Sequence, residues 1–303
     1  MISVVIPLFN KEGLIGDTIN SVLNQTCQNF EIVVVNDGSS DHSVVEVEAI
    51  NDCRIRLINQ SNAGVSEARN RGIQEAKGKY IAFLDADDKW HPDYLESINE
   101  LIKAYPDCDV LTARYQFIDE YGNTRPSILR GIEQGCSNCR LDNYFHIASN
   151  SDAPLWTSAV VASRNALISV GGFPVGITSG EDLLTWAKLA TKYNIALCNK
   201  ILATYYTPTS GPTGKVPADL KSTHDAVGTQ LCQLFTEYPE SGIKEYVAFW
   251  YKMRSRINIG RCNRWATIKC ACKSLRYNFK QIKPWVFMAL AVSPNVVIKK
   301  ILG

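Results

Sequence analysis

The chain has 303 residues, of which 46% are hydrophobic and 20% are charged, a composition typical of a soluble globular protein with room for about two domains. Its N-terminus lacks the plan of a secretion signal peptide, and no apolar run reaches the roughly 18–20 residues that span a bilayer. The net charge of +2 hides an asymmetry, because residues 247–303 contain 12 Lys or Arg and no Asp or Glu. Such a basic tail favours an anionic partner, either a membrane surface or a nucleic acid.

Buried strands and amphipathic helices alternate along the first part of the chain. Short apolar runs predict the strands, and apolar residues at helical spacing predict the helices. The expected strands cover 2–6, 30–35, 55–58 and 80–84, and the expected helices cover 14–25, 41–50 and 65–76. This alternation predicts an α/β fold with a wound, mainly parallel sheet and helices on both faces. The carboxyl ends of these strands should form the nucleotide site. Residues placed along that edge are Phe9, Asp37, Gly64 and Asp87.

Three carboxylates follow the strand at 80–84 within four positions, those of Asp85, Asp87 and Asp88. Clustered carboxylates repel one another unless a cation lies among them, so the cluster indicates a divalent metal and a phosphorylated ligand. The simpler alternative is that Asp87 or Asp88 caps the following helix, since Asp favours that position. One Asp would be explained in this way, whereas three together favour the metal site.

The loop after the first strand has neither a G-x-G-x-x-G motif nor a Walker Gly-Lys-Ser/Thr motif. Phosphates should therefore be held by a metal and a side chain. Arg69 is the candidate side chain, because a planar guanidinium suits phosphate or ribose contacts. Asp37 could accept a hydrogen bond from a base N–H or a ribose hydroxyl. The alternatives are a solvated Arg on a helix and an ordinary turn Asp.

The middle of the chain gives weaker signals. We expect strands at 110–118, 156–161 and 202–206, helices at 93–105, 164–170 and 183–193, and an irregular stretch at 125–151. Glu181 and Asp182 precede the helix at 183–193. Two acids there complement the helix dipole, although one of them could instead act as a general base. Residues 207–217 are rich in Pro, Gly and Thr and indicate a linker or mobile loop.

The remainder of the chain is expected to be helical and basic. The apolar run at 285–292, followed by apolar residues around Lys299 and Lys300, is too short to span a membrane but suits a helix lying in its interface. A core helix or a dimer-packing helix is the alternative, so a homodimer is possible. Nucleic acid is the less favoured partner, because the tail contains no recognisable binding module.

Six segments, taken together and in order, resemble the family 2 glycosyltransferases, which are inverting enzymes of the GT-A fold. They are VVIPLFN at 4–10, VVNDGSSD at 34–41, NAG at 62–64 with ARNRG at 68–72, FLDADD at 83–88, GGF at 171–173 and GED at 180–182. The resemblance implies a GT-A nucleotide-sugar-binding and catalytic domain at 1–206. Residues 207–303 would add a flexible loop and a helical region for the acceptor or the membrane.

The resemblance also implies a role for individual residues. A UDP-sugar would be the usual donor, and Mn²⁺ or Mg²⁺ would neutralise its diphosphate leaving group. Asp87 and Asp85 would be metal ligands, and His224 could be a further one, as some GT-A enzymes use a downstream His. Asp182 would be the general base, with Glu181 beside it. The implied nucleotide-binding residues are Pro7, Phe9, Asn10, Asp37, Gly64, Arg69, Asp85 and Ala86.

Two departures from the family pattern qualify this interpretation. Asn36 stands where the first of two Asp residues is usual, which leaves Asp37 alone to hold the base. Arg261 stands where the Q-x-x-R-W motif of processive synthases has Gln. We therefore expect a non-processive enzyme that adds single sugars to a glycan or lipid-linked acceptor, in the cytoplasm and peripheral on the inner face of the cytoplasmic membrane. A sugar-nucleotide pyrophosphorylase and an inactive GT-A scaffold that binds glycans are the alternatives.

Overall fold

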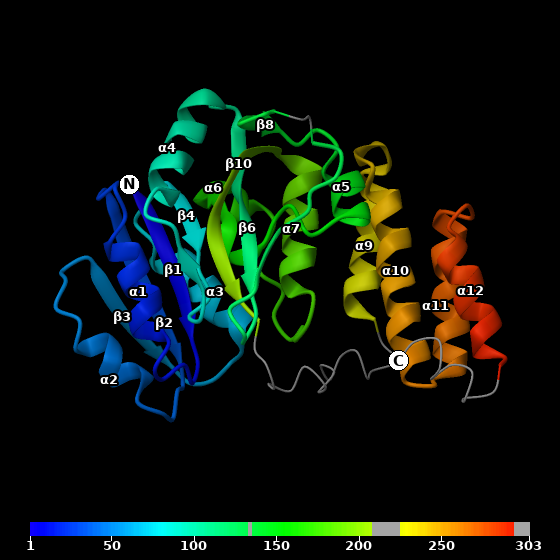
Figure 1. Ribbon diagram of the computed structural model, residues 1–303, viewed down its shortest axis with the longest axis horizontal. Helices are drawn as coiled ribbons and strands as arrows, with labels where there is room; N and C mark the ends of the chain where they lie inside the picture. The colour runs from blue at the N-terminus through cyan, green and yellow to red at the C-terminus, as the bar shows by residue number, and fades with distance from the viewer. Residues whose placement is uncertain (133–134, 208–224, 294–303) are drawn as a thin grey trace.

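The computed structural model describes residues 1–132, 135–207 and 225–293 (Figure 1). Within these residues a mixed sheet forms the centre, and a group of C-terminal helices lies to one side of it. The strands are β1 (Ile2–Leu8), β2 (Phe30–Asp37), β3 (Ile55–Gln60), β4 (Tyr80–Phe83), β5 (Lys89–Trp90), β6 (Cys108–Ile118), β7 (Thr124–Pro126), β8 (Asn138–Arg140), β9 (Val160–Ser163) and β10 (Asn194–Tyr206). The helices are α1 (Ile15–Leu23), α2 (Ser43–Glu48), α3 (Val65–Glu75), α4 (Tyr94–Ala104), α5 (Tyr144–Asn150), α6 (Arg164–Ser169), α7 (Glu181–Lys192), α9 (Ala226–Glu237), α10 (Ile243–Gly260), α11 (Arg264–Tyr277) and α12 (Ile282–Ala291).

The sheet confirms the predicted wound, mainly parallel topology. Its order is β3-β2-β1-β4-β9-β6-β10-β5. β1 pairs in parallel with β2 on one side and with β4 on the other, so that Val4 lies between Ile32 and Ala82. β9 runs antiparallel to both β4 and β6, which makes the sheet mixed. The chain changes its winding direction between β1 and β4, and open α/β sheets bind ligands at such a point.

Alternate residues of the buried strands supply two hydrophobic cores. Val4 and Ile6 of β1 join one cluster with apolar residues of α1 and α4, whereas Val5 joins another with α3, α6 and α7. All three side chains are fully buried. Successive strand residues point to opposite faces of a sheet, so helices on both faces require an unbroken apolar run. The continuous apolar sequence of β1 is explained by this requirement.

Three of the sequence predictions were wrong in detail. The strand expected at 156–161 begins only at Val160, as β9, because Thr157–Ala159 forms a short 3-10 helix. The stretch at 125–151 is not irregular throughout, because Tyr144–Asn150 forms α5, whose Tyr144, Phe145 and Ile147 are buried against the core. The few apolar residues of α5 stand within a polar stretch and give no clear helical pattern. Packing of α5 against α7 and α10 is what buries them. The last strand begins at Asn194, well before residue 202. Its pairing with β6 shifts register between Cys198 and Ile201, so the polar residues between them form an irregularity within one strand.

The C-terminal helices continue the core of the sheet. Val227 of α9 and Tyr246 and Trp250 of α10 belong to the same buried cluster as Val5 of β1. α11 packs against α10, and α12 packs against both of them, farther from the sheet (Figure 1). The predicted helical character is confirmed for the described residues, whereas the domain boundary at residue 206 remains a prediction. In the described part of the chain, no helix is both long enough and apolar enough to cross a bilayer.

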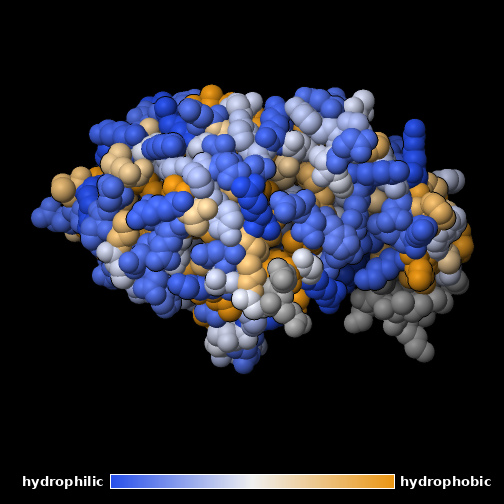
Figure 2. Space-filling view, turned by 90° about the horizontal axis from the view of Figure 1, so that it is seen from above, coloured by the Kyte–Doolittle hydropathy of each residue, from blue (hydrophilic) through white to orange (hydrophobic). Residues whose placement is uncertain are grey.

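The outer end of this helical region carries exposed apolar side chains. Figure 2 shows apolar atoms gathered where α11 and α12 lie, while hydrophilic atoms dominate most of the remaining visible face. The exposed residues are Trp265, Phe279, Ile282, Trp285, Val286 and Val292. We refer to these exposed side chains as the apolar surface of α11 and α12.

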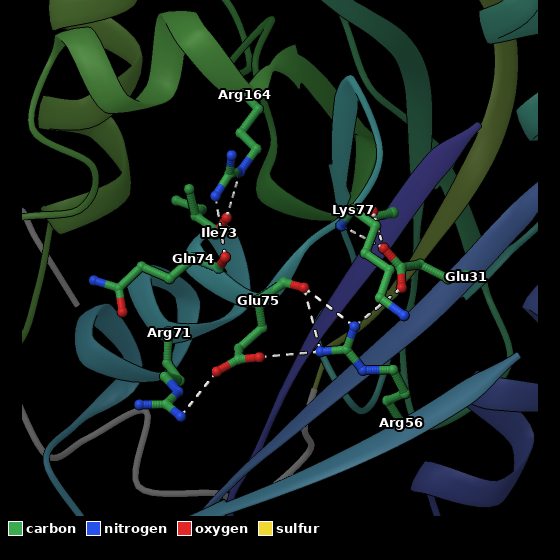
Figure 3. Close-up of polar contacts among 9 residues, drawn as sticks. Glu31, Arg56, Arg71, Ile73, Gln74, Glu75, Lys77 and Arg164 are labelled. Atoms are coloured by element: carbon green, nitrogen blue, oxygen red, sulfur yellow. Dashed lines mark hydrogen bonds and ion pairs between the residues drawn. The ribbon is translucent and has the colours of Figure 1, made fainter.

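A network of ion pairs and hydrogen bonds lies at the edge of the sheet where the parallel strands begin, which we call the amino-terminal edge (Figure 3). Glu31 of β2 accepts from the Ser3 hydroxyl and from the backbone N–H of Lys77, both at 2.6 Å. Arg56 of β3 lies 3.4 Å from Glu31 and donates to the Glu75 carboxylate at 3.1 Å. Arg164 donates to two carbonyl groups in the last turn of α3, which caps that helix. This edge is therefore fixed by paired charges.

Candidate active site

A cavity of about 600 Å³ opens at the carboxyl ends of β1, β2 and β4, as the sequence predicts. α3 begins at its wall, where Gly64, Val65 and Ser66 are among the lining residues. The first N–H groups of a helix and its dipole favour an anion. Gly64, which stands directly before a helical run, was the signal in the sequence for this contribution. The lining residues are Pro7, Leu8, Phe9, Lys11, Asp37, Asn62, Ala63, Gly64, Val65, Ser66, Ala68, Arg69, Asp85, Ala86, Asp87, Gly176, Ile177, Thr178 and Tyr205.

Asp37 organises the wall of the cavity between β3 and α3. Its carboxylate accepts from the backbone N–H groups of Ala63 at 2.9 Å and Gly64 at 2.8 Å. Gln60 adds a third hydrogen bond at 2.8 Å. The turn after Asp37 requires glycine, because Gly38 has a φ of +74° and a Cβ there would lie 2.9 Å from the backbone nitrogen of Asn62. Asp37 thus has a structural role that the sequence did not reveal, in addition to lining the cavity.

Arg69 is a buried cation that joins two separate parts of the site. Its guanidinium donates to Asp85 at 2.8 Å and to Glu181 at 3.1 Å, and only 4% of the residue is exposed. Burial opposes its charge, but the nearby carboxylates of Asp85 and Glu181 more than offset that cost, so the pKa of Arg69 is raised. Its guanidinium also lies 5.1 Å from the ring centroid of Phe173. The solvated helix Arg considered from sequence is therefore excluded.

The next residue, Asn70, holds the Gly171–Phe173 segment against α3. Its side chain donates to the carbonyl of Phe173 and accepts from the N–H of the same residue, both at 2.8 Å. Gly172 has a φ of +64°, and a Cβ there would lie 2.4 Å from Asn70 Oδ1. A side chain at position 172 is therefore incompatible with this contact. The two segments that were grouped by resemblance touch directly in the fold.

The three acidic residues after β4 have different environments. The Asp85 and Asp87 side chains line the cavity and remain 30% and 29% exposed, respectively. Asp88 is instead fully buried and accepts from the Ser158 hydroxyl at 2.5 Å. Burial and the charge of Asp85 raise the pKa of Asp88 well above its usual value. Asp88 therefore anchors the loop, and two carboxylates rather than three face the cavity.

Lys11 provides a cation at the cavity that the sequence analysis did not single out. Its ammonium group lies 2.5 Å from Asp87. The position of Lys11 after the first strand, at the predicted ligand edge, was the available signal. Because Lys11 and Arg69 each contact one carboxylate of the cavity, both Asp87 and Asp85 are paired with positive charge. These two ion pairs largely neutralise the carboxylates that face the cavity.

The donor set at the cavity fits a divalent cation that a ligand helps to hold. Among the described residues no group of three or more His, Cys, Asp or Glu side chains could enclose a metal. Mg²⁺, however, is usually bound by one or two carboxylates together with substrate phosphates and water. Asp85 and Asp87, half-buried and facing the cavity, match that arrangement. His224, the third expected ligand, lies outside the described residues.

Glu181 and Asp182 begin α7, which runs beside the site without lining the cavity. Glu181 is held by Arg69, whereas Asp182 has no ion pair among the described residues. Asp182 accepts from the N–H of Leu183 at 2.7 Å and from the Thr157 hydroxyl at 3.4 Å. Burial raises the pKa of both carboxyl groups, and the adjacent charge of Asp182 adds to the effect on Glu181. These environments favour Asp182 as the freer proton acceptor.

The structure therefore brings most of the expected site residues to one cavity. Pro7, Phe9, Asp37, Gly64, Arg69, Asp85, Ala86 and Asp87 line it. Asn10 does not; it has a φ of 51°, and its side chain accepts from the N–H of Ser40, which ties the first loop to the second. Tyr205 at the end of β10 lines the cavity and was not expected. The ligand-binding and catalytic roles of all these residues remain predictions.

A wound sheet with helices on both faces and a cavity at its switch point places the protein among the open α/β folds. The model of glycosyl transferase family 2 matches residues 3–166, which is more than half of the chain. The chain therefore belongs to glycosyl transferase family 2.

Individual relatives support this membership. An uncharacterized glycosyltransferase of Rickettsia felis is 35% identical over 204 residues, which are 67% of this chain and 32% of that protein. The uncharacterized glycosyltransferase EpsJ of Bacillus subtilis is 47% identical over 90 residues, which are 29% of this chain and 26% of that protein. The matched region thus spans about a third or less of these curated relatives.

Solved structures of S. aureus TarS share the fold. TarS 1–349 matches with a TM-score of 0.69 and 17% identity over 99% of this chain and 90% of that chain. Its complex with UDP-GlcNAc matches with a TM-score of 0.63 and 17% identity over 96% of this chain and 90% of that chain. At this identity the likeness shows the fold alone. The fold is the GT-A fold, as the resemblance implied.

Proposed function

We propose that this protein is an inverting, metal-dependent glycosyltransferase that moves one sugar from a UDP-sugar to a hydroxyl group of a glycan or lipid-linked acceptor in surface polysaccharide biosynthesis. The observation that carries the proposal is the cavity at the switch point, where Asp37, Arg69 and the Asp85–Asp87 carboxylates meet. Family membership supports it, as do the solved complexes of TarS with UDP-GlcNAc and with UDP.

The cavity offers complementary groups for each part of a nucleotide donor. Phe9 lines the cavity and is 47% exposed, so its ring can stack on a base, and Asp37 lies at the end of the neighbouring strand. The N-terminus of α3 and Lys11 favour the diphosphate. Arg69 positions Asp85 and Glu181 through its two ion pairs. Asp85 and Asp87 would hold Mn²⁺ or Mg²⁺, which, when bound, would stabilise the negative charge of the leaving diphosphate.

Asp182 is the proposed general base for the acceptor hydroxyl. It takes the proton as that oxygen attacks the anomeric carbon from the face opposite to the leaving diphosphate, so one displacement inverts the configuration. A raised pKa makes a carboxylate a stronger base near neutral pH. Glu181 is less suited to the role, because its ion pair with Arg69 stabilises the charged form that a base must give up.

The protein is further proposed to act as a peripheral protein at the cytoplasmic face of a membrane. The apolar surface of α11 and α12, which includes Ile282 and Trp285, lies in the basic part of the chain. An apolar face flanked by Lys and Arg suits binding in the interface of anionic lipids. Removal of residues 284–303 should release the protein from anionic vesicles and leave donor binding intact.

A panel of nucleotides and UDP-sugars, with and without Mn²⁺, tests the proposal by thermal shift and by product analysis. A metal-dependent rise in melting temperature with UDP, and release of UDP during transfer, are expected. Release of pyrophosphate would instead identify a sugar-nucleotide pyrophosphorylase. Absence of any nucleotide binding would favour an inactive glycan-binding scaffold and contradict the proposal.

A further inference from the structure

A second cavity, of about 860 Å³, lies between the α5 region and the C-terminal helices. Its lining combines the loop around β7, the end of α5 and the facing sides of α10 and α12. The lining residues are Arg125, Ile128, Arg130, Ser149, Asn150, Ser151, Asp152, Phe249, Lys252, Met253, Arg256, Lys283 and Phe287. Five of them are cationic and one, Asp152, is acidic. We refer to this site as the basic cavity.

The positive charge of the basic cavity is only partly balanced. Asp152 pairs with Arg125 at 2.7 Å. Within the described parts of the chain, no carboxylate forms an ion pair with Lys252, Arg256 or Lys283. Like charges gathered in a concave surface repel one another, and this repulsion is relieved when an anion binds between them.

The environment of Lys252 is a second observation that favours binding of an anion in the basic cavity. Its side chain is half-buried, and its ammonium group lies 5.1 Å from the ring centroid of Phe249. Burial lowers the pKa of Lys252, and the nearby charge of Lys283 lowers it further, while Glu245 acts in the opposite direction. Burial and the like charge of Lys283 thus both disfavour the charged form of Lys252, and an anion bound beside it would relieve this effect.

The basic cavity lies close to the first cavity, which we call the donor cavity because it is the proposed site of the nucleotide donor. The ring of Phe117 lies between the two cavities. The Arg125 guanidinium is 4.0 Å from the ring centroid of Phe117. That centroid is in turn 5.8 Å from the ring centroid of Tyr205, which lines the donor cavity. The chain makes a second connection, because Asp152 is five residues before Thr157, a separation that spans at most about 18 Å. Thr157 donates to Asp182, the proposed base.

The other side of the basic cavity adjoins the apolar surface. Lys283 and Phe287 of α12 line the cavity, while Ile282, Trp285 and Val286 of the same helix are exposed. One helix thus separates a cluster of cations from an apolar face. A ligand with an anionic group followed by an apolar chain would match both features.

We propose that the basic cavity binds the phosphate or diphosphate group of the acceptor, so that the acceptor is a phosphate-linked glycan. This inference rests on the proposed function, since it names the acceptor class for the same reaction. A phosphate in the cavity places the attached sugar toward the donor cavity across Phe117. It also places a lipid chain, where the acceptor has one, toward the exposed face of α12. Two phosphates account for more of the unpaired cations than a single carboxylate would.

Inorganic pyrophosphate in the presence of EDTA is the direct probe, measured by titration calorimetry on the full chain. Lys283→Glu introduces an acid on an exposed position of the cavity, and Lys280→Glu makes the same change at an exposed position outside it. We expect binding to weaken about tenfold or more in Lys283→Glu, equivalent to about 1.4 kcal/mol, and to be unchanged in Lys280→Glu. Equal binding by both variants, or no binding by the wild type, overturns the inference.

Vesicles of phosphatidylglycerol separate a phosphate site from general attraction to a charged surface. If Lys283→Glu and Lys280→Glu reduce vesicle binding equally while pyrophosphate binding is unchanged, the cavity is not a phosphate site. Lys252→Glu serves as a second variant at the half-buried position, with Lys269→Glu as its exposed control. The expected result is selective loss of pyrophosphate binding in Lys252→Glu.

Activity distinguishes failure of this inference from failure of the proposed function. Lys283→Glu should retain metal-dependent hydrolysis of the donor and show a raised KM for transfer to a phosphate-linked acceptor. A wild-type protein that hydrolyses no UDP-sugar would contradict the proposed function and leave the pyrophosphate result to stand by itself. Unchanged acceptor KM in Lys283→Glu would overturn the acceptor assignment.

Discussion

The two edges of the sheet use charged residues in opposite ways. At the amino-terminal edge, Glu31 and Glu75 are matched by Arg56 and Arg71 (Figure 3). At the carboxyl-terminal edge, carboxylates outnumber cations, and Asp88 and Asp182 are buried or half-buried without an ion pair among the described residues. Balanced charge at one edge stabilises the fold. At the other edge, burial of Asp88 and Asp182 without an ion pair carries a desolvation cost.

The pKa values of the aspartates show the same contrast. Just before β3, Arg54 hydrogen-bonds to Asp52 and lowers the pKa of that carboxyl to about 2. At the start of α7, burial raises the pKa of Asp182. A group that is strongly stabilised as an anion is a poor base, whereas a destabilised anion is a better one. The contrast supports the proposal that the carboxyl-terminal edge carries the active site, because raised pKa values of buried carboxyl groups are concentrated at functional sites.

Substitution of the proposed base should have the largest effect. Asp182→Asn keeps the shape of the side chain and removes its basicity, so we expect kcat to fall by about 10²–10⁴-fold. The melting temperature should change little. Steady-state transfer assays check this, with Asp107→Asn, an exposed aspartate at the amino-terminal edge, as the matched control. A wild-type kcat in Asp182→Asn would show that Asp182 is not the general base, and it would contradict a catalytic role for the carboxyl-terminal edge at this residue.

Loss of the proposed metal ligand comes next. Asp87→Ala should abolish the Mn²⁺ dependence of UDP binding and lower kcat/KM by about two orders of magnitude, since removal of one electrostatic contact of this type typically has such an effect. Thermal shift with UDP, with and without EDTA, measures the dependence. Asp107→Ala is the control. If Asp87→Ala still shows the full metal-dependent shift, Asp87 is not a ligand.

A substitution at the amino-terminal edge should lower the stability of the fold and leave kcat unchanged. Glu31→Ala leaves the Ser3 hydroxyl and the N–H of Lys77 without their acceptor, and such a loss costs about 1–3 kcal/mol of unfolding free energy. Urea unfolding should show that loss while kcat stays at the wild-type value. The exposed Glu48 supplies the control variant, Glu48→Ala. A large fall in kcat with unchanged stability would mean that the edges are not separated in function.

The smallest effect is expected in the pH profile. A base must be deprotonated, so kcat/KM should rise as the pH increases through the pKa of Asp182. Because burial raises that pKa, the acid limb should lie above the usual Asp value of about 3.9. The rate profile, corrected for unfolding at each pH, measures it. An acid limb at or below that value would show that a different carboxyl group is the base.

Much of the fold followed from local patterns in the sequence. The apolar run of β1 and the helical spacing in α1 predict a wound sheet, since a strand buried on both faces and a helix buried on one produce distinct periodicities. The patterns failed at α5 and at the start of β10. In both places the apolar residues are few and interrupted, and the structure depends on contacts with distant elements.

The sequence alone identified a set of candidate site residues, most of which line the cavity. Only the tertiary structure showed how their side chains are arranged. The ends of parallel strands meet at one edge, so Phe9, Asp37 and Asp87 could be placed together before any contact was known. No spacing rule could show that Asp88 turns inward to Ser158, that Lys11 reaches Asp87, or that Arg69 joins Asp85 to Glu181. Nor could it assemble the basic cavity from α10, α12 and the loop around β7. Periodicity is a property of neighbouring residues, whereas pairing and burial of charge depend on which distant segments the fold brings into contact.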